Sequence, residues 1–147
     1  MRTYMKIVVL LLPLLLCHAL NSYAESYGDY QGAVYLKNYD GDTIRFNLPG
    51  YPPIAGKDIR VRVNGIDTPE IKGKCKKEKY EAQQARDMVA DILKGAEKIN
   101  LKNMKRGKYF RIAADVIVDG ENLADVLIEA GMAIKYNGGK KTYKWCD

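Results

Sequence analysis

Two short acidic segments are the part of this sequence that could hold a metal ion. The first is Asp40-Gly41-Asp42-Thr43 and the second is Asp67-Thr68-Pro69-Glu70. If the fold brings them together, four carboxylates converge, and hard oxygen ligands of that kind suit calcium or magnesium. Each segment alone has an ordinary interpretation, because Asp-Gly is a common turn and Thr-Pro-Glu a common helix start. The sequence therefore predicts a cation site on condition that the two segments meet.

Two arginines could complement these acids by binding a phosphate. Arg62 lies five residues before Asp67, and Arg111 follows Lys108-Tyr109. Guanidinium groups match phosphate geometry and stay charged at any relevant pH, although each arginine alone is better explained as a solvated strand residue. The odd spacing would put Arg62 and Asp67 on opposite faces of a regular strand. We therefore expect Asn64-Gly65 to supply a bulge or exit that brings them together.

The residue inventory excludes several classes of hydrolase. The single histidine is His18, and the last serine in the chain is Ser26. If the N-terminal segment is removed, the remaining chain has no histidine. Serine–histidine triads, cysteine–histidine pairs and histidine zinc sites are then excluded. Hydrolysis would have to depend on carboxylates, arginines, lysines, tyrosines or a metal held by oxygen.

Residues 1–24 are predicted to be a secretory signal peptide. They combine two early basic residues, the apolar run Ile7–Leu16 and the small-residue pattern Ser22-Tyr23-Ala24 before the cleavage point. The run is shorter than the roughly 20 residues that span a bilayer, and an uncleaved anchor is the alternative. We expect one exported domain, residues 25–147, in the periplasm or secreted, with no membrane attachment after cleavage. It keeps 22 basic and 18 acidic residues, a modest positive excess that suits a polyanionic partner.

Two cysteines remain in the predicted exported domain, Cys75 and Cys146. In an oxidising compartment they are predicted to form a disulfide. The bridge would close a loop of about 70 residues and stabilise the fold by about 4 kcal/mol in the chain-entropy model. Two free thiols are the alternative.

The hydrophobic pattern predicts an α+β, mainly β fold. Apolar and polar residues alternate in the strands, whereas apolar residues recur every three or four positions between Lys76 and Lys94, which indicates a helix. Three strands, this helix, two strands and a short helix ending at Gly131 are expected, and this is the order of a five-stranded OB-type barrel with two helices. The expected strands are Val34–Asn38, Thr43–Leu48, Ile59–Val63, one beginning at Ile99, and Tyr109–Val118, which would contain Arg111.

The acidic and basic motifs together resemble the staphylococcal nuclease (thermonuclease) family in order and internal spacing. The motifs are Asp40-Gly41-Asp42-Thr43, Arg62, Asp67-Thr68-Pro69-Glu70 and Lys108-Tyr109-Phe110-Arg111. The likeness extends over about residues 33–133. It implies an OB-type barrel and calcium-dependent endonucleolytic hydrolysis of DNA and RNA. The bond to the 5′ oxygen would break, leaving 3′-phosphate ends.

The resemblance also implies a calcium site. Asp42 and Asp67 correspond to direct ligands of the ion, together with the backbone carbonyl of Thr68. Asp40 corresponds to a supporting carboxylate.

Roles in catalysis and substrate binding follow from the same resemblance. Glu70 corresponds to the residue that orients or deprotonates the attacking water. Arg62 and Arg111 correspond to the pair that holds the phosphate and stabilises its growing charge. Lys108 and Tyr109 correspond to residues beside the nucleotide site.

The chain departs from the family pattern at two places. Phe110 stands where the family often has glycine. The aromatic residues that cover the base lie after Gly131 in the family, and Tyr136 and Tyr143 are candidates here.

Two rival interpretations stay open. Such barrels also serve as nucleic-acid-binding modules without catalysis, and a calcium-stabilised exported protein without a nucleic-acid role is the other possibility. A binding module would be expected to lack at least one of five residues, all of which are present: Asp42, Arg62, Asp67, Glu70 and Arg111. The sequence therefore favours an enzyme, expected to be monomeric, that acts on DNA and RNA.

Overall fold

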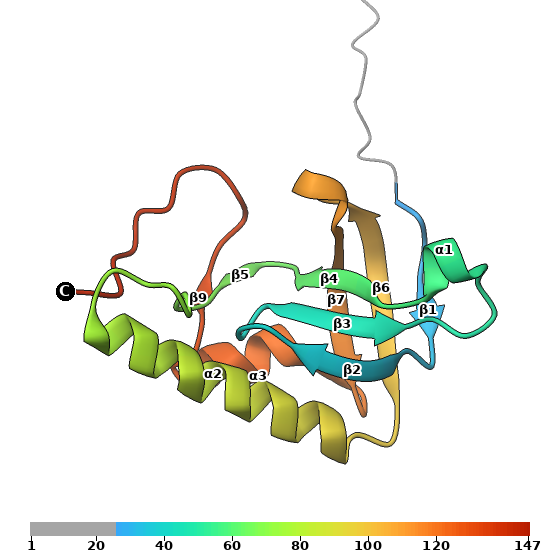
Figure 1. The fold of residues 1–147 in the computed structure, drawn as a ribbon, viewed down its shortest axis with the longest axis horizontal. Coiled ribbons are helices and arrows are strands. Elements are labelled where there is room, and N and C mark those ends of the chain that lie inside the picture. The colour runs from blue at the N-terminus through green and yellow to red at the C-terminus, as the bar shows by residue number, and fades with distance from the viewer. Residues whose placement is uncertain (1–25) are drawn as a thin grey trace, which may run out of the picture.

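A computed structural model of the chain describes residues 26–147, apart from the side chain of Lys108. The predicted signal peptide, residues 1–24, lies outside the described residues. The described chain forms a curled, mostly antiparallel sheet with its two longer helices packed on one side of it (Figure 1). The strand order is β1 (Tyr30–Gln31), β6 (Ile99–Arg106), β7 (Ile112–Val118), β4 (Ile59–Val63), β3 (Thr43–Asn47) and β2 (Val34–Asn38), with β8 (Glu121–Asn122) paired to β7.

Five of these strands are at least five residues long, and they correspond to the five predicted ones. Alternation explains their two faces. Ile44 pairs with Val61, and both are fully buried in the core. The next residues along the two strands, Thr43 and Arg62, also pair with each other. They lie on the opposite face, because successive side chains of a strand alternate and directly paired residues point to the same side of a sheet. The predicted α+β, OB-type architecture is confirmed.

Helix α2 (Lys76–Gly95) covers the core as the predicted amphipathic helix. Its buried positions Ala82, Ala85, Val89 and Leu93 recur at three- and four-residue spacing. The shorter helix α3 (Leu123–Glu129) ends just before Gly131, whose φ of 71° suits glycine. No helix among residues 26–147 is long and apolar enough to cross a membrane.

The structure differs from the sequence prediction around the turn after β6. Strand β7 begins at Ile112, so Arg111 lies just before it, and the prediction that Arg111 is part of a strand starting at Tyr109 is wrong. Tyr109 and Phe110 belong to a 3-10 turn, Lys108–Phe110, and both have a φ of 58°. Backbone in this left-handed region cannot continue a strand ladder.

Besides the 3-10 turn, several short elements were not expected from the sequence, and β1 and β8 are two of them. Helix α1 is a single turn, Pro53–Gly56, in the predicted loop before the third strand. Strands β5 (Ile66–Asp67) and β9 (Ile134–Lys135) pair antiparallel in a separate small sheet. This pairing places the beginning of the C-terminal segment directly beside Asp67.

Candidate active site

A cleft of about 940 Å³ lies over the polar face of β3 and β4. The turn after β6 and the C-terminal segment both project on the side of the sheet away from α2 and α3 (Figure 1). Cationic side chains outnumber the acids in the cleft wall, which favours entry of a polyanion. The lining residues are Lys37, Asn38, Tyr39, Asp40, Thr43, Arg45, Arg60, Arg62, Glu70, Arg111, Tyr136, Gly138, Gly139 and Lys141.

The first acidic segment forms the turn between β2 and β3. The Asp40 carboxylate accepts hydrogen bonds from the backbone N–H groups of Asp42, at 3.1 Å, and Thr43, at 2.7 Å. Gly41 is required here because a Cβ would lie 2.8 Å from Thr68 Cγ2 and 3.1 Å from Ala85 Cβ. The turn therefore packs closely against the second acidic segment.

The expected meeting of the two acidic segments is seen directly. The backbone N–H of Thr68 donates to Asp42 Oδ2 at 3.3 Å. Asp42, Asp67 and Thr68 are all about 2 % exposed. Two carboxylates that are 25 positions apart in the sequence thus lie side by side below the cleft floor.

Arg62 bridges these two carboxylates. Its Nη1 lies 2.6 Å from Asp42 Oδ1 and its Nη2 lies 3.3 Å from Asp67 Oδ1. The contact with Asp67 is possible because the chain turns at Asn64-Gly65, with a φ of 76° at Gly65, before β5 starts. The Asn64-Gly65 exit therefore overcomes the odd spacing in the sequence.

Lys141 makes a second bridge. Its Nζ lies 2.7 Å from Asp67 Oδ1 and 3.1 Å from Glu70 Oε1. Asp42, Asp67 and Glu70 are therefore linked in one row through the guanidinium of Arg62 and the ammonium of Lys141. Sequence reasoning missed Lys141, because nothing in the local pattern distinguishes it from its neighbour Lys140.

Burial and repulsion from neighbouring acids make Asp42 and Asp40 hard to ionise. The pKa of Asp42 is raised from 3.8 to about 7, mainly by desolvation and next by the charges of Asp40 and Asp67, against the opposing effect of Arg62. Desolvation also raises the pKa of Asp40. Burial lowers the pKa of Lys141, but its contacts with Asp67 and Glu70 outweigh this and raise it overall. Crowded, buried acids of this kind gain stability from a cation.

The donor set fits a hard divalent ion in its chemistry. Asp42 and Asp67 offer carboxylate oxygens, Thr68 offers a backbone carbonyl and Asp40 lies next to them in the turn, all of which suit calcium. The repulsion that raises the pKa of Asp42 is the feature of this structure that such an ion would relieve. The ligand roles of these residues stay predictions.

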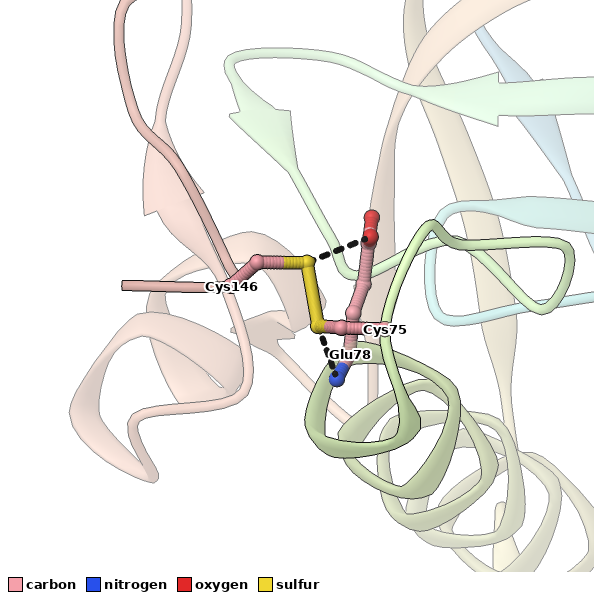
Figure 2. Close-up of side chains that lie close together, drawn as sticks. All are labelled: Cys75, Glu78 and Cys146. Atoms are coloured by element: carbon pink, nitrogen blue, oxygen red, sulfur yellow. Dashed lines mark hydrogen bonds between the residues drawn. A yellow bond between two sulfur atoms is a disulfide. The ribbon is translucent and has the colours of Figure 1, made fainter.

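A second compact cluster has a different explanation. Atoms of Cys75, Glu78 and Cys146 lie within 4.8 Å of one another (Figure 2). The two sulfur atoms are joined in a disulfide, as predicted from the sequence. Bonded sulfurs carry no thiolate and do not act as the metal ligands that free cysteines would be. This cluster is therefore a structural anchor.

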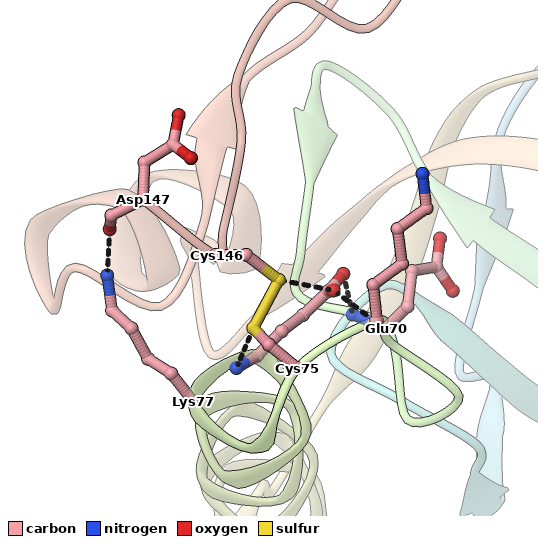
Figure 3. Close-up of a disulfide and its surroundings, with 7 residues drawn as sticks. Glu70, Cys75, Lys77, Cys146 and Asp147 are labelled. Carbon is pink, nitrogen blue, oxygen red and sulfur yellow. Dashed lines mark hydrogen bonds between the residues drawn. A yellow bond between two sulfur atoms is a disulfide. The ribbon is translucent and has the colours of Figure 1, made fainter.

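Glu78 connects that anchor to the acidic segment. It is 8 % exposed, and its carboxylate accepts hydrogen bonds from the backbone N–H groups of Lys74, at 2.8 Å, and Glu70, at 3.4 Å (Figure 3). Its own N–H donates to Sγ of Cys75, the N-cap of α2. The Cys-x-x-Glu spacing is a variant of the capping box and could have identified Glu78 from the sequence.

Only some of the remaining predicted residues line the cleft. Arg111 lines it, and its Cζ lies 5.9 Å from the ring centre of Tyr109. Tyr109 itself is 86 % exposed. The side chain of Lys108 is not described. Of the two candidate aromatic residues after Gly131, Tyr136 lines the cleft, whereas Tyr143 packs against Trp145 with ring centres 4.8 Å apart.

Comparison with known proteins gives one family match. The model of a family described as staphylococcal nuclease homologue matches residues 60–145. A search of curated proteins finds no match. The matched range contains Arg62, Asp67, Glu70 and Arg111 but begins after the first acidic segment. The contacts of Asp42 with Arg62 and Thr68 attach that segment to the matched range.

Proposed function

The chain belongs to the staphylococcal nuclease family, and from this premise we propose that it is a calcium-dependent endonuclease that hydrolyses DNA and RNA. It would break the bond between phosphorus and the 5′ oxygen and leave 3′-phosphate ends. The observation that carries the proposal is the bridge made by Arg62 between Asp42 and Asp67 at the floor of a cationic cleft. The protein would act as an exported monomer, in the periplasm or the medium.

The exposed position of Glu70 supports a role in handling water. Its side chain is 46 % exposed and lines the cleft, whereas Asp67 is buried. A carboxylate that solvent reaches can accept a proton from a water molecule as its oxygen attacks phosphorus. The 5′ oxygen then leaves and takes up a proton from solvent, which completes the hydrolysis.

The two arginines support binding of the phosphate. Arg62 and Arg111 both line the cleft, and a guanidinium donates paired hydrogen bonds to phosphate oxygens. Their charges would oppose the negative charge that grows on the phosphate oxygens in the transition state. A calcium ion at the carboxylates would supply further stabilisation of that charge.

Exposed aromatic rings at the rim support binding of unpaired bases. Phe110 is 89 % exposed and follows Tyr109, which is also exposed. Arg106 Cζ lies 5.5 Å from the centre of the Phe110 ring and 5.9 Å from that of Tyr27. Rings beside cationic groups are the usual platform for single-stranded nucleic acid.

The test is digestion of plasmid DNA, single-stranded DNA and RNA by the mature protein with calcium and, separately, with a chelator. We expect cleavage in calcium only, with 3′-phosphate ends that resist extension by a polymerase until a phosphatase removes them. Binding without cleavage would support a non-catalytic OB-fold module instead. Cleavage that continues in the chelator would contradict the calcium requirement.

A further inference from the structure

We infer that Lys141 is a positioning residue of the active site, held there by a C-terminal strap that the Cys75–Cys146 disulfide anchors. The inference rests on the proposed function and adds a residue from outside the predicted motifs. The C-terminal strap is defined here as residues 136–146. Lys141 lies near its middle and contacts the carboxylates of Asp67 and Glu70.

The C-terminal strap is fixed at both ends to the segment that carries these acids. At its start, β9 pairs with β5, which contains Asp67, and Tyr136 N–H donates to the carbonyl of Gly65 at 2.8 Å. At its end, Cys146 is bonded to Cys75, five residues after Glu70. Both anchors restrict the distance that Lys141 can move from the carboxylates.

The far anchor is also rigid on the side of α2. Cys75 caps α2, and Glu78 in the first turn holds the backbone N–H of Glu70 (Figure 3). Lys77 Nζ adds a hydrogen bond to the carbonyl oxygen of Asp147 at 2.6 Å. The disulfide therefore ties the C-terminal strap to the helix turn that fixes the backbone of Glu70.

The two contacts of Lys141 have different consequences. Asp67 Oδ1 accepts from both Arg62 and Lys141. An ammonium fixed 2.7 Å from this carboxylate opposes the approach of a second cation to either of its oxygens. Lys141 thus weakens binding of a divalent ion at Asp67.

The contact of Lys141 with Glu70 favours the reaction, whereas its contact with Asp67 weakens binding of the ion. Lys141 forms a salt bridge with the Glu70 carboxylate, whose side chain is about half exposed. A salt bridge that restricts its rotamers keeps the carboxylate oriented toward the cleft. Without Lys141, the proposed water-activating group would spend less time in a productive geometry.

These two contacts predict changes of opposite sign in one variant. Lys141→Ala should bind calcium about fivefold or more tightly, because a like charge is removed from the site. The kcat of this variant should fall by roughly tenfold, because the Glu70 carboxylate loses the salt bridge that orients it. Damage to the fold would weaken both calcium binding and turnover, so the opposite signs distinguish positioning from structure.

The experiment is isothermal titration of the substrate-free mature protein with calcium chloride, together with steady-state cleavage of single-stranded DNA. Lys140→Ala is the matched control, because it removes the same charge from the neighbouring exposed position. Lys141→Arg keeps the charge and should restore most of the wild-type calcium affinity and kcat. Circular dichroism checks that each variant is folded.

The contribution of the disulfide is tested by replacing both cysteines. Cys75→Ser/Cys146→Ser retains a hydroxyl that can cap α2. We expect it to reproduce the effects of Lys141→Ala and to add little when combined with Lys141→Ala, as residues of one unit do. Additive effects would overturn the role of the disulfide as the anchor of Lys141.

The outcomes separate this inference from the proposed function. If Lys141→Ala has the same calcium affinity and the same kcat as Lys140→Ala, the inference is overturned and the proposed nuclease activity stands. If Lys141→Ala changes the calcium affinity but neither the wild type nor any variant cleaves nucleic acid, the proposed function is overturned. The effect of Lys141 on binding of the ion then stands. A wild-type protein that binds no calcium would overturn both.

Discussion

The guanidinium of Arg62, which lines the floor of the cleft, lies 2.6 Å from the carboxylate of Asp42 buried below that floor. Arg62 projects from β4, one residue before the strand ends, and Asp42 ends the turn before β3. Four predictions follow from this floor and from the loops around it.

Asp42→Asn should change the pH dependence of stability in ion-free protein. The pKa of Asp42 is about 7 in the fold against 3.8 ordinarily. The native state therefore binds an extra proton between these values, and wild-type stability declines as pH rises from about 4 to about 7. Asparagine does not titrate, so the variant should match wild type near pH 4 and exceed it at pH 8, by on the order of a few kcal/mol.

Urea denaturation in chelator at several pH values measures this difference. Adding calcium at pH 8 should reverse the order, because the variant has lost a proposed ligand. A constant difference between the two proteins across this pH range would show that Asp42 is ionised in the fold throughout.

Arg111→Ala should lower kcat for DNA cleavage by about a hundredfold or more, because a donor to the developing phosphate charge is lost. The same loss is expected for Arg62→Ala, with an additional loss of stability since Asp42 and Asp67 remain buried without that partner. Arg86→Ala, on the exposed part of α2, is the control for loss of one charge. An unchanged kcat in either test variant would mean that the site is misplaced.

Gly41→Ala should destabilise the protein by about 1–3 kcal/mol, because the new methyl group meets Thr68 and Ala85 where no room exists. The same crowding would push Asp42 away from the second acidic segment and weaken calcium binding. Thermal denaturation and calcium titration measure the two effects. Gly95→Ala is the control, since its Cβ would meet nothing within 4 Å.

Phe110→Gly should weaken binding of single-stranded DNA by roughly tenfold without destabilising the fold. Phe110 has a φ of 58°, a conformation that glycine adopts without strain, and its ring is almost fully exposed. Loss of one stacking ring should lower affinity by about 1–3 kcal/mol. Fluorescence anisotropy with labelled oligonucleotides measures the affinity, and Tyr80→Ala on α2 is the control.

Much of the fold could be predicted because the signals are local and repeated. Alternation around Ile44 and Val61 and the three- and four-residue spacing in α2 identify strands and helix from neighbours in the sequence. The boundary at Tyr109 was wrong because a left-handed backbone at aromatic residues has no signature in hydrophobicity. The left-handed backbone at Tyr109 and Phe110 delays the start of β7 to Ile112, so Arg111 lies outside the strand.

The acidic part of the candidate site was predicted from residue type and spacing, but its complete composition was not. The bridge from Arg62 to Asp67 depends on the Asn64-Gly65 turn, which the sequence does show. Lys141 and Glu70 are 71 positions apart in the sequence. Their contact depends on how the C-terminal strap is attached to the rest of the fold. Contacts of that separation follow from the assembled fold and not from the local pattern.

The parallel pairing of β4 with β7 has a kinetic consequence. Arg62 lies opposite Ala113, which comes some fifty positions later, and the intervening chain includes all of α2. Contacts so distant in sequence require closure of a long loop and therefore form slowly. We expect Arg62 to reach its final surroundings late in folding. In pulse-labelling experiments, the β4 amides that bond β7 should therefore become protected later than the amides of the β2–β3 hairpin.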